Sequence, residues 1–142
     1  MTRAGGALDQ QLWDFVYAYD AAYDRAARTA GLSAAQACLL DALTRGSRSM
    51  GELAVELLCD ASNVTQLVTR LEAGGLVTRV PDPDDRRVKQ VSITPAGRRV
   101  RRAVGRAFDL PARGLGRLTE GERAQLSGML AKLLEPDASS PS

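Results

Sequence analysis

Apolar and polar positions along the chain follow helical spacing in most segments and strand spacing in one. Over residues 8–30, apolar residues three or four positions apart predict a long helix, which Gly31 is suited to end. These positions are Leu8, Leu12, Phe15, Val16, Tyr19, Tyr23 and Ala26. Trp13 and Tyr17 lie off the centre of this stripe, so the segment offers extra aromatic surface to a partner subunit or a small ligand.

Two capping boxes predict two further helices. Ser33 with Gln36 opens a helix that ends near Arg45-Gly46-Ser47, and Ser49 with Glu52 opens a shorter one. Apolar contacts are expected from Cys38, Leu39, Leu40 and Leu43 in the first helix and from Leu53, Ala54, Leu57 and Leu58 in the second.

A fourth helix follows, capped by Asp60 or Ser62 and ended by Gly74-Gly75. Its inward side is expected to consist of Val64, Leu67, Val68 and Leu71. Its outward side then carries Ser62, Gln66, Thr69 and Ala73, flanked by Asn63 and Arg70.

The pattern next changes to strand spacing. Residues 76–80 and 88–93 predict two short strands, joined by a charged, turn-rich tip at 81–87. Thr94 followed by Pro95 predicts the start of a long basic helix that runs to about Leu110, before Pro111.

The last predicted helix begins at a capping box formed by Thr119 and Glu122. Its apolar positions are Leu126, Met129, Leu130, Leu133 and Leu134. The composition of residues 136–142 is typical of a disordered tail.

Together these elements predict a mainly α fold with a small β-hairpin wing. Residues 32–94 describe a winged helix-turn-helix, and residues 1–31 and 95–135 form a flanking helical region. The apolar stripes of the flanking helices exceed what one small winged helix can cover. We therefore expect the flanking helices to form a dimerisation region, with a bundle inside one chain as the alternative.

Charge is distributed unevenly. The segment 70–106 holds ten basic and four acidic residues, a net charge of +6 within a chain of net charge +2, which leaves −4 elsewhere. Such asymmetry is expected where one face meets a polyanion, although a solvated basic helix would also produce it.

Catalysis is disfavoured by composition. The chain has no histidine, which removes histidine-based nucleophile pairs and imidazole metal ligands, and Cys38 and Cys59 form no CxxC pair. No cofactor and no metal are expected. The first residues lack the apolar core of a signal peptide, and no run is long enough to span a membrane, so a cytoplasmic location is expected.

The predicted winged helix-turn-helix suggests where DNA would be contacted. Ser62, Asn63 and Gln66 lie near the start of the outward-facing fourth helix, where small polar and amide side chains reach base edges in a major groove, and its N-terminus favours a phosphate. At the hairpin tip, Arg87 is spaced to enter a minor groove with Asp85 holding its guanidinium. Further contacts are expected from Thr69 and Arg70 on the helix and from Arg86 and Lys89 on the hairpin.

Several segments carry a family resemblance. Residues 82–87 (DPDDRR) and 92–97 (SITPAG) resemble the wing signature of the MarR family of transcriptional regulators. Residues 63–77 are similar to that family's recognition helix and its exit, and residues 49–54 fit the preceding helix. Spacing and order match from about Leu8 to Leu134, with the wing signature as the most specific part.

The resemblance implies a triangular homodimer that binds a pseudo-palindromic operator, typically as a repressor. It also implies that Arg87 is the minor-groove arginine, that Asp85 supports it, and that Ser62, Asn63 and Gln66 face the major groove. Many relatives have a basic residue in place of Gln66. Because glutamine prefers adenine edges, the target sequence is expected to differ from theirs.

The resemblance further implies release of DNA by a small aromatic or lipophilic effector. Trp13, Tyr17 and Tyr23 offer stacking surface for it, and Arg25 or Arg28 could meet an acidic group, but core and dimer packing is the competing interpretation. Some relatives sense oxidants through a cysteine near the start of the first helix, and this chain has none there. We expect Cys38 to be a buried small hydrophobe and Cys59 to serve packing, with an exposed Cys59 whose oxidation disturbs DNA contacts as the alternative.

Two other classes of function remain as alternatives. A winged helix can act as a protein-interaction module, which predicts no salt-dependent DNA binding. An enzyme is disfavoured by the missing histidine and the missing cofactor motifs.

Overall fold

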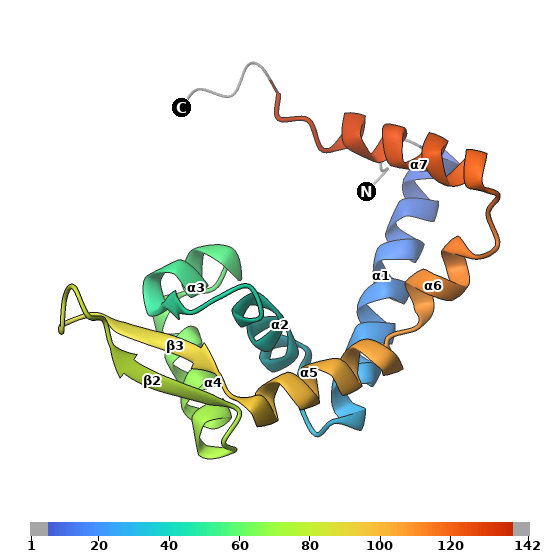
Figure 1. The fold of residues 1–142 in the computed structure, drawn as a ribbon. Coiled ribbons are helices and arrows are strands. Elements are labelled where there is room, and N and C mark those ends of the chain that lie inside the picture. Colours follow the sequence, from blue (N-terminus) through green and yellow to red (C-terminus); the bar gives the residue numbers. More distant parts are fainter. Residues whose placement is uncertain (1–5, 138–142) are drawn as a thin grey trace. The chain divides into compact units, whose positions relative to one another are not determined.

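The computed structural model describes residues 6–137 of the chain. In chain order the elements are α1 (Gly6–Thr29), α2 (Ala34–Leu43), β1 (Arg48–Ser49), α3 (Met50–Glu56), α4 (Ala61–Ala73), β2 (Val77–Pro81), β3 (Lys89–Ile93), α5 (Pro95–Ala107), α6 (Leu110–Leu115) and α7 (Glu120–Leu133) (Figure 1). The mainly α fold with a small wing is therefore confirmed. Residues 1–5 of the predicted dimerisation region and 138–142 of the predicted tail lie outside the described residues.

The chain divides into two compact units, Met1–Phe108 and Asp109–Ser142. The first unit holds the winged helix-turn-helix together with α1 and α5. The division falls after α5, whereas the sequence placed a regional boundary before it, because α5 packs against α1 and α2. The second unit holds α6 and α7.

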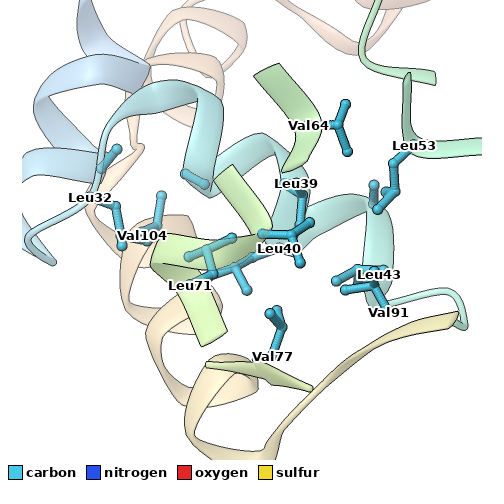
Figure 2. Close-up of a cluster of buried hydrophobic side chains, with 14 of the residues drawn as sticks. Leu32, Leu39, Leu40, Leu43, Leu53, Val64, Leu71, Val77, Val91 and Val104 are labelled. Carbon is cyan, nitrogen blue, oxygen red and sulfur yellow. The ribbon is translucent and has the colours of Figure 1, made fainter. Parts of the chain in front are cut away.

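The hydrophobic core of the first unit is built around α2. Leu39, Leu40 and Leu43 are almost fully buried, and α4 contributes Val64, Val68 and Leu71 to the same cluster. Val77 and Val91 close it from the two wing strands (Figure 2). Burying a side chain of this size stabilises the fold by about 1.5–3 kcal/mol, so this cluster holds α4 and the root of the wing in one body.

The predicted helix caps are confirmed. Full capping boxes join Ser33 to Gln36, Ser49 to Glu52 and Thr119 to Glu122. The Thr94 hydroxyl accepts from the Gly97 amide at the start of α5, with proline in the first turn. These motifs are readable from sequence because both partners lie within four residues.

The sheet contains one strand that the sequence pattern did not predict. β3 lies at its centre, with β2 and the two-residue β1 on either side, all antiparallel. Arg48 pairs with Val91 and Ser49 with Gln90, so β1 depends on residues about forty positions away. The hairpin of β2 and β3 extends beyond α4 as the predicted wing (Figure 1).

The predicted end of the basic helix was wrong. α5 ends at Ala107, and Pro111, expected to follow the helix, lies in the first turn of the separate helix α6. Proline is tolerated there because the first backbone N–H groups of a helix have no intrahelical acceptor. The same proline that would break a helix interior therefore begins a new one.

Leu58 also differs from its prediction. Its side chain is 94% exposed, although an apolar contact was expected. Its backbone is left-handed, with φ of 53°, which costs a residue with a Cβ about 1 kcal/mol. This conformation makes the tight turn between α3 and α4, and it directs the side chain away from the core.

Large apolar side chains remain exposed on α1 and on α7. On α1 they are Leu8, Leu12, Trp13, Phe15, Val16, Tyr17 and Tyr19, and on α7 they are Leu126, Met129, Leu130 and Leu133. Both helices follow the predicted apolar positions, and within its own unit each stripe is left exposed by the described residues. Among residues 6–137, no helix is both long and apolar enough to cross a bilayer.

Gly97 permits a close backbone approach at the start of α5. A Cβ at this position would lie 2.1 Å from the Leu76 carbonyl oxygen and 2.8 Å from Ile93 Cγ1. Both distances are far inside van der Waals contact. A residue with a side chain would therefore force α5 away from the root of the wing.

Gly97→Ala is expected to destabilise the protein by about 3 kcal/mol or more, because neither the Leu76 backbone nor the packed Ile93 can yield cheaply. Chemical denaturation monitored by circular dichroism measures this loss. Gly105→Ala in the same helix is the matched control, since nothing lies within 4 Å of its added Cβ. The control should gain about 0.5–1 kcal/mol from helix propensity. Equal stability of the two variants would contradict the close approach.

Candidate nucleic-acid interface

The candidate recognition helix α4 presents one polar face to solvent. Val64, Val68 and Leu71 anchor its opposite face in the core, and Leu67 is half-buried beside them. All the residues predicted to face outward are exposed, namely Ser62, Asn63, Gln66, Thr69, Arg70 and Ala73. The core contacts therefore fix which side chains are available for binding.

The N-cap of α4 is Asp60 and not Ser62, the other residue that the sequence predicted for this position. Its carboxylate accepts the Asn63 amide at 2.9 Å and the Ser62 hydroxyl at 2.8 Å. The hydrogen bond from the Asn63 backbone, followed by that from Ser62, lowers the pKa of Asp60. An ionised carboxylate thus occupies the helix terminus, which makes the predicted phosphate contact at that terminus less favourable.

The polar residues of α4 fall into two groups. Ser62 and Thr69 are hydrogen-bonded within the protein, to Asp60 and Arg79 respectively. The side chains of Asn63, Gln66 and Arg70 make no hydrogen bond or ion pair to the described part of the chain. These three are therefore free to contact an external partner without breaking an internal contact.

Arg79, which the sequence reading did not single out, links α4 to the wing. It donates to the Thr69 hydroxyl, and its Nε lies 3.6 Å from a Glu72 carboxylate oxygen. The other Glu72 oxygen accepts the Arg79 backbone amide at 3.1 Å. The i to i+3 spacing of Thr69 and Glu72 puts both on one side of α4, but only the fold brings strand β2 next to them.

The wing tip is organised by Asp82. One carboxylate oxygen accepts the backbone amides of Asp84 at 2.8 Å and Asp85 at 3.4 Å. The other accepts the Gln90 side-chain amide at 2.8 Å. The bond from the Asp84 amide, then that from Gln90, lowers the pKa of Asp82. A short polar side chain that binds backbone two residues ahead is a common turn-forming device, so this role was readable from the sequence.

The predicted support of Arg87 by Asp85 takes a different form. The Asp85 carboxylate accepts the backbone amide of Arg87 at 3.1 Å, and no ion pair within 4 Å joins the carboxylate to the Arg87 guanidinium. Arg86, Arg87 and Lys89 are all exposed and form no ion pair with any residue in 6–137. In the wing, the carboxylates of Asp82 and Asp85 therefore bind backbone amides, and the basic side chains at the tip remain without a carboxylate partner among residues 6–137.

A hollow of about 490 Å³ opens between α1, α2 and α5 within the first unit. Tyr23 lines it, as predicted for an effector pocket. Trp13 and Tyr17 do not line it; they stack on each other with ring centroids 5.7 Å apart. Arg25 and Arg28, expected to meet an acidic ligand, are also not among its lining residues.

The prediction for Cys38 was wrong. Its side chain is exposed and lines this hollow, because α2 turns Leu39 and Leu40 into the core instead. The walls of the hollow partly desolvate the exposed Cys38 thiol, which raises its pKa and keeps it protonated. Cys59 is half-buried, packs against the core and donates to the Leu57 carbonyl at 3.4 Å, in line with the expected packing role.

No group of three or more cysteines, aspartates or glutamates is arranged to hold a metal ion among the described residues. The hollow and the exposed face of α4 with the wing are thus candidate binding features of the first unit, besides the exposed apolar side chains of α1.

The chain is similar in sequence to a family of transcriptional regulators. A model of the MarR family matches residues 30–88. The chain is 40% identical over 80 residues to the transcriptional activatory protein BadR of Rhodopseudomonas palustris, covering 54% of this chain and 46% of BadR. It is 33% identical to the transcriptional repressor MdtR of Bacillus subtilis, covering 74% of this chain and 69% of MdtR.

The fold is shared with solved structures. The crystal structure of a mutant MarR from E. coli complexed with operator DNA superposes with a TM-score of 0.75 at 25% identity, covering 90% of this chain and 94% of that one. Over the matched segments the chain spans about half the length of BadR and of two further curated regulators.

Asp82→Ala is expected to loosen the wing tip while leaving the core intact. The amides of Asp84 and Asp85 should exchange hydrogen several-fold faster, because the variant lacks their acceptor, and the unfolding midpoint should stay nearly unchanged. Hydrogen exchange resolved by residue measures this effect.

The pH dependence follows from the lowered pKa of Asp82. A carboxyl whose pKa is lower in the folded state stabilises the wing above its ordinary pKa, and this support is lost as pH falls through the lower folded value. The native wing should therefore loosen only below about pH 4. Asp84→Ala, whose carboxylate accepts no hydrogen bond within residues 6–137, is the control. Unchanged protection in Asp82→Ala would contradict the assignment.

Proposed function

The chain belongs to the MarR family of winged helix-turn-helix transcriptional regulators, and on this premise we propose that it binds a pseudo-palindromic DNA operator as a homodimer. We further propose that it acts as a repressor and that a small effector releases it from DNA. The observation that carries the DNA-binding proposal is the combination, in one compact unit, of a free polar face on α4 and an uncompensated basic wing tip.

In this proposal α4 enters the major groove. Asn63 and Gln66 lie in its first two turns, and their exposed side chains, without a partner among residues 6–137, can reach base edges. Amide side chains pair best with adenine, so operator positions facing Gln66 should favour adenine. Arg70, one turn further on, is placed for a phosphate.

The wing supplies the second contact. Arg87 at the tip enters the adjacent minor groove, while Arg86 and Lys89 contact phosphates. Because no carboxylate of the described chain neutralises these side chains, they can bind DNA without first breaking an internal ion pair. Support also comes from the fold shared with a MarR–operator complex.

The homodimer is supported by the apolar side chains left exposed on α1 and α7. On α7, Met129 is 58% exposed and Leu133 65%, and on α1 Phe15 is 58% exposed. Such side chains at helical spacing are stabilised when a second copy covers them. A symmetric dimer also presents two equal winged helices, which is what a pseudo-palindromic site requires.

Repression and release from DNA by an effector are proposed in addition to DNA binding. BadR is described as an activatory protein and MdtR as a repressor, so relatives of this chain regulate in either direction. Release is supported by the hollow, which α5 lines together with α1 and α2. A ligand there would contact the helix that leads directly from β3.

The first test selects fragments of sheared genomic DNA with the purified protein and titrates the best fragment by fluorescence anisotropy at several salt concentrations. A pseudo-palindromic site and a steep loss of affinity with salt are expected. Arg87→Ala should weaken binding by about 1–3 kcal/mol, which is roughly 5- to 150-fold. Lys89→Ala should lower the salt slope by about one.

Arg25→Ala is the matched control, since it removes one exposed cation of the same unit outside the proposed interface. If no fragment is enriched, or if the Arg25 and Arg87 variants lose the same affinity, DNA recognition through the wing is refuted.

The dimer is tested by sedimentation. The native protein should sediment at twice the mass of the chain. Met129→Glu should shift it to the monomer, because an unpaired charge in an apolar interface costs about 3 kcal/mol or more. Gln125→Glu, which adds the same charge on the same helix at a polar position, should leave the dimer intact. A native monomer, or a monomeric Gln125 variant, would argue against this interface.

A further inference from the structure

We propose that the hollow between α1, α2 and α5 binds a lipophilic organic cation, an inference that names the class of effector and so rests on the function proposed above. Five charged residues line the hollow, and acids outnumber bases. The acids are Asp20, Asp41 and Glu56, and the bases are Arg45 and Arg101.

Both arginines are already engaged by lining carboxylates. Arg101 donates through two nitrogens to one Asp41 oxygen, at 2.7 and 2.9 Å, and so joins α5 to α2. Arg45 donates to Glu56 at 2.9 Å. The charge of both arginines is thus already balanced by carboxylates, and an anionic ligand at their remaining N–H groups would lie close to Asp41 or Glu56.

Asp20 is the carboxylate that remains. It lies on α1 at the edge of the hollow and forms no ion pair or hydrogen bond with the described residues. Its charge acts on a group inside the hollow. Desolvation raises the pKa of Cys38 most, and the negative charges of Asp41 and Asp20 raise it further. After burial and Cys38, Asp41 also raises the pKa of Tyr23. Arg101 lowers the pKa of Tyr23 in turn, so the charge of Asp41 is partly balanced, and Asp20 is the lining carboxylate without an ion pair to the described residues.

The aromatic lining suits the same class of ligand. Tyr19 and Tyr23 meet Phe108 edge to face, with ring centroids 5.0 and 5.1 Å from it. The faces of such rings attract cations by about 0.5–1 kcal/mol at exposed sites. Val104 and Leu57 add apolar surface beside them. The lining thus combines an apolar wall, aromatic rings and an uncompensated carboxylate.

The volume limits the size of the ligand. A hollow of about 490 Å³ lies within the usual range of small-molecule sites. It is open on one side, so a ligand of one or two fused rings with a single cationic group is the class that it fits. The cationic group would lie toward Asp20 and the rings toward Phe108.

The test is calorimetric titration of the DNA-free protein with three probes of similar shape. These are 2-naphthylmethyltrimethylammonium, 2-naphthylmethanol and 2-naphthylacetate. The cation should bind at least about fivefold more tightly than the alcohol or the anion, which corresponds to an exposed ion pair with a cation–π contribution. Asp20→Asn should lower the affinity for the cation about fivefold and leave that for the alcohol unchanged.

Two variants serve as controls. Asp20→Glu keeps the charge and should retain the preference for the cation. Asp14→Asn removes a carboxylate from the same helix outside the hollow and should change nothing. Tightest binding of the anion, no binding of any probe, or an unchanged cation affinity in Asp20→Asn would overturn the proposal.

DNA binding is tested independently of the ligand, by the anisotropy assay with no probe added. If the protein binds no DNA, the calorimetric preference is still measured. If it binds DNA, the cation should raise the Kd for the operator and the alcohol should do so less.

Discussion

The backbone carbonyl groups of Gly75 and Leu76 hold three parts of the molecule together. The Thr94 hydroxyl donates to the Gly75 carbonyl at 2.7 Å, and the Thr94 amide donates to that of Leu76 at 3.0 Å. Gly97 lies against the same Leu76 carbonyl. The end of α4, the root of the wing and the start of α5 therefore meet at one rigid joint. The positions of the recognition helix, the wing and the hollow all depend on it.

On α4 and the wing, two acidic side chains stabilise the protein internally, while Arg86, Arg87 and Lys89 form no ion pair with the described residues. Asp60 caps α4 and Asp82 shapes the wing tip. Asp82 forms no ion pair with Arg86 or Arg87, which follow it in the wing. A net charge alone would not reveal this division, because it depends on which carboxylate oxygens accept backbone amides. In the hollow the relation is reversed, since there the arginines are paired and Asp20 is not.

The local features of the fold could be predicted from the sequence, and the non-local ones could not. The capping boxes and the exposed side of α4 depend on residues within one or two helical turns, so spacing alone predicts them. Strand β1 needs β3 for its hydrogen bonds. Pro111 was expected to follow a helix, yet it begins α6, because its effect depends on whether the turn before it is already broken. Cys38 faces the hollow because its neighbours Leu39 and Leu40 fill the core, which is a matter of packing.

The contact of Arg79 with Thr69 has a consequence for how the recognition helix can be dissected. Thr69 is exposed to a partner but also bonded to the wing strand, with Glu72 engaging the same arginine. Replacing Thr69 therefore perturbs two surfaces at once, and its effect will not add to that of replacing Arg79. Only a double-mutant cycle separates the contribution of base contact from that of wing placement. The effects of substitutions on α4 and on the wing are therefore energetically coupled at this contact.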